Sequence, residues 1–199
     1  MKSAIILFVR NPELGKVKTR LARDIGDELA LKVYKQLLVH THAITCDLAC
    51  DKYVFYTDSI SQADIWNDKN YFKRLQTGND LGEKMQQAFQ ALFNTGYDKV
   101  VIIGSDCPGL TSHLIESAFD LLDAAKVVLG PAADGGYYLL GMTFMIEDLF
   151  KNKQWSTSSV FKDSIDNLIH KHIKYSILTV LHDIDTKEDL VQLNYEVSE

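Results

Sequence analysis

Residues 99–110 constrain the fold of this chain more than any other stretch. They read Lys-Val-Val-Ile-Ile-Gly-Ser-Asp-Cys-Pro-Gly-Leu, a β-branched run that ends in glycine and leads into a turn containing Asp106. A continuous apolar run of this kind is typical of a strand buried on both faces of a parallel sheet. Ligands of open α/β sheets bind beyond the carboxyl ends of the strands, so Asp106 is placed to meet a metal ion or a phosphate-bearing ligand. The structural alternative is that Asp106 only caps the turn before a helix that begins near Thr111.

Other apolar segments mark further strands and helices. Strands are expected at 4–9, 53–57, 71–76, 126–129 and 175–181. Apolar residues spaced four apart predict one long amphipathic helix over about 22–46, and further helices are expected after residue 80, at 111–123 and at 158–170. With 199 residues, 46% of them hydrophobic, the chain is long enough for one buried core, and we expect a single domain over residues 1–199.

The charge and the cysteine content exclude several functional classes. A net charge of −6 and a pI of about 5.5 offer no basic field for nucleic acid or an anionic membrane. The three cysteines form no disulfide pattern, which fits a reducing compartment. The apolar segment within residues 1–9 is too short for a membrane span or a signal-peptide core, so we expect a cytoplasmic protein.

The loop at residues 10–21 is the most basic stretch of this acidic chain. Its four cations are Arg10, Lys16, Lys18 and Arg20. Between a strand and a helix, such charges and free backbone N–H groups can converge on phosphate. The loop matches neither the Walker A pattern nor the dinucleotide-binding glycine pattern. A solvated basic loop without a ligand is the structural alternative.

Glycines beside acidic residues mark two candidate binding turns. Asp80 is placed to cap an expected helix, and Gly82 leaves room for a flat ligand or a phosphate to approach the backbone. Asp134 precedes Gly135 and Gly136, where a tight turn could bring a carboxylate and bare backbone against a substrate. An ordinary hairpin turn through these residues is the alternative.

Two aspartates, Asp183 and Asp185, follow the last expected strand and project to the same side. Together with Asp106 and Asp134 they place carboxylates at several strand ends. Carboxylates favour a hard divalent cation, Mg²⁺ or Mn²⁺, which usually binds through one or two of them plus substrate phosphates. With the basic loop on the other side of those phosphates, the set suits group transfer at a diphosphate or triphosphate.

Two further side chains have competing interpretations. Cys107 adjoins Asp106, whose negative charge disfavours a thiolate, so a cysteine nucleophile is not expected. Trp155 stands in a loop beside two hydroxyl residues, where it could contact a substrate or serve as a packing anchor.

Seven short motifs, in this order, resemble those of one bacterial family. They are Phe-Val-Arg-Asn-Pro (8–12), Gly-Lys-Val-Lys-Thr-Arg-Leu (15–21), Asp-Leu-Gly-Glu-Lys-Met (80–85), Gly-Ser-Asp-Cys-Pro (104–108), Asp-Gly-Gly-Tyr (134–137), Trp-Ser-Thr (155–157) and Asp-Ile-Asp-Thr (183–186). The chain resembles a largely uncharacterised family of glycosyltransferase-A-type proteins related to phospholactate guanylyltransferase and other nucleotidyltransferases. The resemblance spans nearly the whole chain, and the motifs are specific for the family jointly rather than one by one.

The resemblance implies an α/β fold like that of the nucleotide-diphospho-sugar transferases, a three-layer α/β/α sandwich with a mainly parallel sheet. It implies that Asp106 binds the metal, with Asp185 or Asp183 as the second acid, and that catalysis depends on Asp106, Lys18 and Arg20. Motif matches assign the phosphates to Arg10, Lys16, Lys18 and Arg20, the base or ribose to Asp80 and Gly82, and the acceptor to Asp134, Gly135, Gly136, Tyr137 and Trp155. Where the nucleotidyltransferases carry a glycine-rich loop, this chain has Arg10-Asn11-Pro12.

We therefore predict a metal-dependent transferase with Mg²⁺ or Mn²⁺ as its cofactor. Its partners would be a nucleotide donor, either a nucleoside triphosphate or a nucleotide sugar, and a small-molecule acceptor, with no role for nucleic acid or a membrane. The alternative is a nucleotide-binding regulatory or scaffold protein without turnover.

Overall fold

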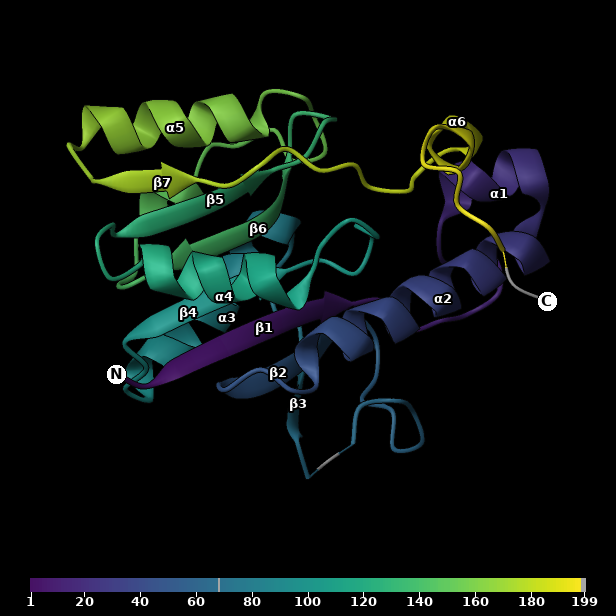
Figure 1. Cartoon of the computed structure of the whole chain (residues 1–199), viewed down its shortest axis with the longest axis horizontal. Helices are drawn as coiled ribbons and strands as arrows, with labels where there is room; N and C mark the ends of the chain where they lie inside the picture. Colours follow the sequence, from purple (N-terminus) through teal and green to yellow (C-terminus); the bar gives the residue numbers. More distant parts are fainter. Residues whose placement is uncertain (68, 198–199) are drawn as a thin grey trace.

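The computed structural model describes residues 1–67 and 69–197. In this part of the chain seven strands form one sheet in the order β3-β2-β1-β4-β6-β5-β7 (Figure 1). All are parallel except β6, which runs antiparallel to both of its neighbours. The strands are β1 (Ser3–Val9), β2 (Asp51–Tyr56), β3 (Tyr71–Leu75), β4 (Lys99–Ile103), β5 (Val127–Pro131), β6 (Tyr137–Met142) and β7 (Tyr175–Ile177). The predicted mainly parallel sheet is confirmed. The expected domain, residues 1–199, also includes residues 68, 198 and 199, which lie outside the described part.

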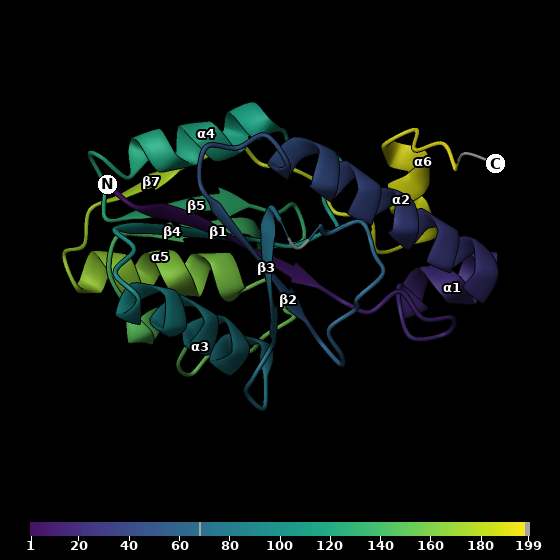
Figure 2. The same ribbon diagram turned by 90° about the horizontal axis from the view of Figure 1, so that it is seen from below.

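Helices cover both faces of the sheet, as Figure 2 shows. Helices α2 (Asp27–Thr45) and α4 (Ser112–Leu121) lie on one face, and α3 (Leu81–Asn94) and α5 (Val160–His170) lie on the other. A separate apolar core fills each side, because β4 is buried along its whole length and alternate side chains point to opposite faces. The predicted three-layer α/β/α sandwich is confirmed. Of the helices described, none combines the length and the apolar character that crossing a lipid bilayer requires.

The prediction of one long helix over 22–46 is wrong. The chain forms two helices there, α1 (Thr19–Ile25) and α2, and Gly26 between them has a φ of 84° and a ψ of 156°. That left-handed φ is tolerated by glycine and ends the first helix. The break folds α1 back against α2, so that Leu21, Val33 and Ile184 share a third apolar cluster beside α6 (Lys187–Gln192).

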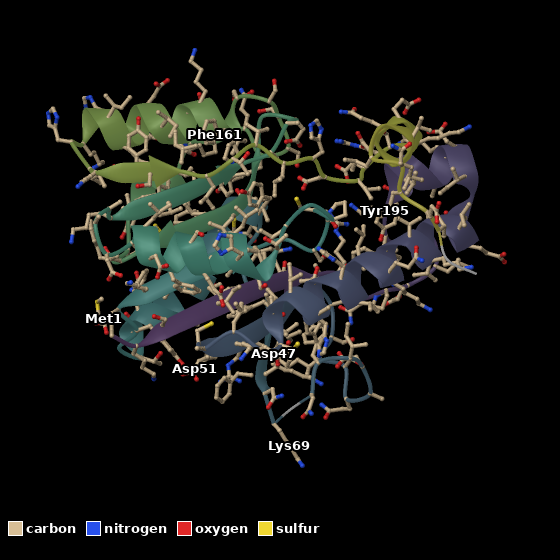
Figure 3. The ribbon with its side chains drawn as sticks, in the orientation of Figure 1. Met1, Asp47, Asp51, Lys69, Phe161 and Tyr195 are labelled. Atoms are coloured by element: carbon tan, nitrogen blue, oxygen red, sulfur yellow. The ribbon has the colours of Figure 1, made fainter. Side chains whose placement is uncertain are left out.

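The last strand is also shorter than predicted. β7 ends at Ile177, not at residue 181, and the chain then runs from the sheet to α6 beside α1, as Figure 1 shows. The segment directly after β7 stays bonded to β5, because the N–H of Leu178 donates to the Leu129 carbonyl at 2.8 Å and that of Leu181 to the Pro131 carbonyl at 3.1 Å. Tyr195, after α6, lies at the end of the molecule away from Met1 (Figure 3). This path carries Asp183 and Asp185 past the carboxyl end of β4. Among the shorter elements, a 3₁₀ helix spans Glu147–Leu149.

Candidate active site

Lys18 joins the basic loop to the predicted acid pair. Its ammonium nitrogen lies 3.0 Å from Asp106 Oδ1 and 3.0 Å from Asp185 Oδ1. The Lys18 side chain is 4% exposed, whereas the two aspartate side chains are 44% and 45% exposed. Three segments far apart in the sequence therefore meet at the carboxyl edge of the sheet, where α/β folds bind their ligands.

The local backbone holds Asp106 in this position. The Asp106 carbonyl accepts a hydrogen bond of 3.0 Å from the N–H of Ile184, which ties the turn after β4 to the segment carrying both later aspartates. The cap of α4 is Thr111, whose side chain accepts from the Leu114 N–H at 3.2 Å. Capping of α4 therefore does not explain Asp106, whose carboxylate is paired with Lys18 instead.

The charge of Lys18 is stabilised by its neighbours. Burial on its own would lower the pKa of this ammonium, but the carboxylates of Asp106 and Asp185 outweigh that effect and raise its pKa above the usual value. The backbone of Lys18 has a left-handed conformation, with a φ of 48°. Lys18 is therefore a permanently charged group held between two acids.

Asp183 is half-buried beside the acid pair. Burial raises its pKa to about 7, and the charges of Asp106 and Asp134 add to the shift. Burial, followed by the charge of Asp183, raises the pKa of the Cys107 thiol to about 12. Cys107 is thus protonated at neutral pH, as expected, but the main causes are burial and Asp183 rather than the adjacent Asp106.

We expect the metal-free protein to lose stability as the pH rises from about 4 to about 7. The Asp183 pKa rises from 3.8 to about 7 on folding, so in this window the folded protein holds a proton that the unfolded chain has released. The contribution is complete below the unfolded-state pKa and is gone once the pH exceeds the folded-state pKa. Urea unfolding in a chelator at about pH 5 and about pH 8 should show the wild type losing at least about 1.4 kcal/mol more than Asp183→Asn. Equal losses in the two proteins would contradict this origin of the pH dependence.

The other cations of the loop are exposed. The Lys16 side chain is 65% exposed and its ammonium pairs with Glu13 at 2.6 Å, while the Arg20 side chain is 64% exposed and lies 3.9 Å from Asp185 Oδ2. Arg10 is also exposed, and its backbone N–H donates to the Tyr34 hydroxyl at 2.8 Å. These side chains are accessible to a ligand, and Arg20 is the one that borders the acid pair.

Asn11 is a structural residue of this edge that sequence reasoning missed. It is buried, its side-chain oxygen accepts from the Asp58 N–H at 3.1 Å, and its side-chain nitrogen donates to the Ser59 carbonyl at 2.9 Å. Gln76 adds a second tie, donating to the carbonyls of Val9 at 3.2 Å and Phe55 at 2.9 Å. These hydrogen bonds tie the carboxyl ends of β1, β2 and β3 together. The Asn-Pro pair, which follows the first strand after Arg10, was the available signal.

The turn at residues 79–83 begins α3 and has a structural reason for its glycine. Asp80 caps the helix by accepting from the Glu83 N–H at 2.8 Å, as expected. A Cβ on Gly82 would stand 2.4 Å from Trp155 Nε1. The flat group that approaches the bare backbone is therefore the Trp155 indole, which is partly buried and packs against the first turn of α3.

The turn at residues 132–136 joins β5 to β6 as a hairpin, the alternative that the sequence left open. Gly136 N–H donates to Asp134 Oδ1 at 2.8 Å, within the turn. Gly135 has a φ of 91°, and a Cβ there would lie 2.2 Å from the Ser158 carbonyl oxygen. The Tyr137 side chain is half-buried, desolvation raises the pKa of its hydroxyl, and that hydroxyl lies 3.9 Å from the Met85 sulfur. Asp134 itself is exposed, and its negative charge contributes to the raised pKa of Asp183.

The acid pair fits part of the ligand set of a hard divalent cation. Both carboxylates are half-exposed, and one oxygen of each lies 3.0 Å from the same ammonium, so the two carboxylates lie close together. Over residues 1–67 and 69–197, no three or more histidine, cysteine, aspartate or glutamate side chains are grouped to hold a metal on their own. Such a set suits Mg²⁺ or Mn²⁺ bound by two carboxylates and completed by water and phosphate oxygens.

Comparisons with solved structures support the fold. The chain is 33% identical to a protein from Desulfovibrio desulfuricans G20 that carries the provisional name nucleotide-diphospho-sugar transferase, with a TM-score of 0.89 over 98% of this chain and 87% of that one. It also matches the inositol-1-phosphate CTP transferase from T. maritima (14% identity, TM-score 0.60, 99% and 94% covered) and the manganese complex of Rv0371c from Mycobacterium tuberculosis (13%, 0.53, 96% of each). These two matches show a shared fold.

Sequence comparison identifies the family. No curated protein matches the sequence. The profile of a family described as an uncharacterized protein conserved in bacteria, DUF2064, matches residues 40–157, more than half of the chain. The matched region contains β4, Asp106 and the hairpin turn after β5. This protein is therefore a member of the DUF2064 family, with the fold of the nucleotide-diphospho-sugar transferases.

Proposed function

We propose that this protein is a metal-dependent transferase that moves a nucleotidyl or glycosyl group from a nucleotide donor onto a small acceptor, within one domain. The observation that supports this best is the meeting of Asp106, Asp185 and Lys18 at the carboxyl edge of a mainly parallel sheet. Two half-exposed carboxylates beside exposed cations form a site for a divalent cation and the phosphates that accompany it.

Each part of the site has a distinct task in this proposal. Asp106 and Asp185 would hold Mg²⁺ or Mn²⁺, with Asp183 as a further acid of the metal site. The bound cation would neutralise the charge that develops on the donor's phosphates. Arg20, Lys16 and Arg10 would attract and orient those phosphates from the solvent side. Positioning and charge neutralisation are the main contributions that a protein makes to transfer at phosphate.

The turns around the site would bind the two ends of the substrates. The turn at Asp80 and Gly82 would lie near the base or ribose, and the hairpin turn with Asp134, Gly135, Gly136 and Tyr137 would lie on the acceptor side. Trp155, which packs against Gly82, would contact the acceptor from between the two turns. The names of two structural relatives, a CTP transferase and a provisional nucleotide-diphospho-sugar transferase, favour a nucleotide donor of one of these kinds.

A screen of nucleoside triphosphates and nucleotide sugars, each with Mg²⁺ or Mn²⁺, tests the proposal. A donor at about 100 times its dissociation constant should stabilise the protein by roughly 2.7 kcal/mol, which a thermal unfolding assay detects. Donors that stabilise the protein are then incubated with candidate acceptors. Pyrophosphate release would indicate nucleotidyl transfer, and release of the nucleoside diphosphate would indicate glycosyl transfer.

Two outcomes of the screen would contradict the proposal. If no donor stabilises the protein with either metal, the nucleotide site is wrong. If donors bind but none yields product with any acceptor, the protein is better described as a nucleotide-binding regulator or scaffold.

A further inference from the structure

Lys18 differs from the other cations of its loop. Its side chain is 4% exposed, against 65% for Lys16 and 64% for Arg20. Its ammonium contacts one oxygen of Asp106 and one of Asp185, both at 3.0 Å. A group so enclosed, with its charge directed at two carboxylates, is not free to reach out to a phosphate as Arg20 is.

The charges around the Lys18 ammonium favour binding of a divalent cation together with phosphate over binding of the cation alone. The two carboxylates and the ammonium together carry one net negative charge. A divalent cation sharing the same carboxylates would leave this group with one net positive charge and would be repelled by the ammonium. Phosphate oxygens on the cation restore the balance. Without the lysine, the cation alone would neutralise the two acids.

We infer that Lys18 is a positioning residue that makes divalent-cation binding depend on the phosphates of the donor. This inference rests on the proposed function, because it concerns the same two acids. While the donor is absent, Lys18 holds the carboxylates of Asp106 and Asp185 close together. Its positive charge also weakens the binding of a metal ion without the donor. The donor's phosphates offset the surplus positive charge, so metal and donor bind together.

Manganese titrations without nucleotide test the inference. Free Mn²⁺, followed by electron paramagnetic resonance, gives the affinity of the metal alone for wild type, Lys18→Met, Lys18→Gln and Lys18→Arg. Removing a unit charge next to a divalent ion should tighten Mn²⁺ binding at least about tenfold in the two neutral variants. Lys18→Arg keeps the charge and should bind Mn²⁺ like the wild type. A folding defect alone would weaken binding, so tighter binding distinguishes the charge effect from damage.

Inorganic pyrophosphate serves as the probe for the donor's phosphates. It should increase the thermal stabilisation by Mn²⁺ more in the wild type than in Lys18→Met.

Equal or weaker Mn²⁺ binding in Lys18→Met and Lys18→Gln, with circular dichroism showing them folded, would overturn the inference. The variant Asp106→Asn shows whether a negative result concerns only the role of Lys18 or the metal site itself. If Mn²⁺ binding needs Asp106 but ignores residue 18, only the role of Lys18 is wrong. If Asp106→Asn binds Mn²⁺ like the wild type, the metal site of the proposed function is wrong as well.

Discussion

Replacing Asp106 with asparagine is expected to lower turnover at least about 100-fold, the scale on which loss of one charge-stabilising group acts in enzyme sites. The change keeps the size of the side chain and an oxygen that Lys18 can contact, but removes the negative charge that a divalent cation needs. Stabilisation by metal and nucleotide together should also weaken, because binding then depends on Asp185 alone. Steady-state kinetics and thermal unfolding with and without Mg²⁺ measure both effects.

Asp120→Asn is the matched control. Asp120 lies on the exposed surface of α4, the helix that follows Asp106, so the same loss of charge occurs outside the site. Its turnover and its metal-dependent stabilisation should equal those of the wild type. Identical behaviour of Asp106→Asn and the wild type would remove Asp106 from the metal site.

Gly135→Ala is expected to lower the free energy of unfolding by about 3 kcal/mol or more. The residue has a φ of 91°, and its Cβ would stand 2.2 Å from the Ser158 carbonyl oxygen. A left-handed backbone costs a non-glycine residue about 1–2 kcal/mol, and overpacking typically adds about 1–3 kcal/mol. The obstacle is backbone, and the hydrogen bond from the Phe161 N–H to the Gly135 carbonyl, 2.9 Å long, holds the two segments together. Chemical denaturation gives the loss directly.

Gly96→Ala separates the two causes. Gly96 has a similar φ of 86°, but nothing lies within 4 Å of the position that its Cβ would take. This control should lose only the backbone term of about 1–2 kcal/mol. If both variants lose the same stability, the close contact between the hairpin turn and Ser158 contributes nothing.

The cations of the basic loop show how far residue type alone could lead. The motif matches assigned the phosphates to Arg10, Lys16, Lys18 and Arg20 alike, and the positive charge of the loop agreed with that assignment. In the structure, Lys16 pairs locally with Glu13 and Arg20 remains exposed, while Lys18 is enclosed by acids from two other segments. The difference arises from burial and distant partners, which no local pattern encodes.

The glycines show the same limit from another side. Their presence at positions 82 and 135 led to the prediction that a ligand or substrate approaches the backbone closely. The approaching groups are Trp155 and the backbone at Ser158, which belong to a loop far along the chain. A glycine reports missing space for a Cβ, and only the folded chain shows what occupies that space.

Local patterns were sufficient for most of the strands, the buried core and the acidic residues at strand ends, because apolar runs and turn residues act over a few positions. They did not predict β6 (Tyr137–Met142), because the glycines around it are not typical of a plain strand. They failed at Gly26, where one left-handed residue turned an expected helix into two. Tertiary structure alone brought Lys18 to Asp185, 167 positions away. That contact goes with the return of the chain after β7 and the packing of α6 beside α1, both of which depend on contacts between segments remote in sequence.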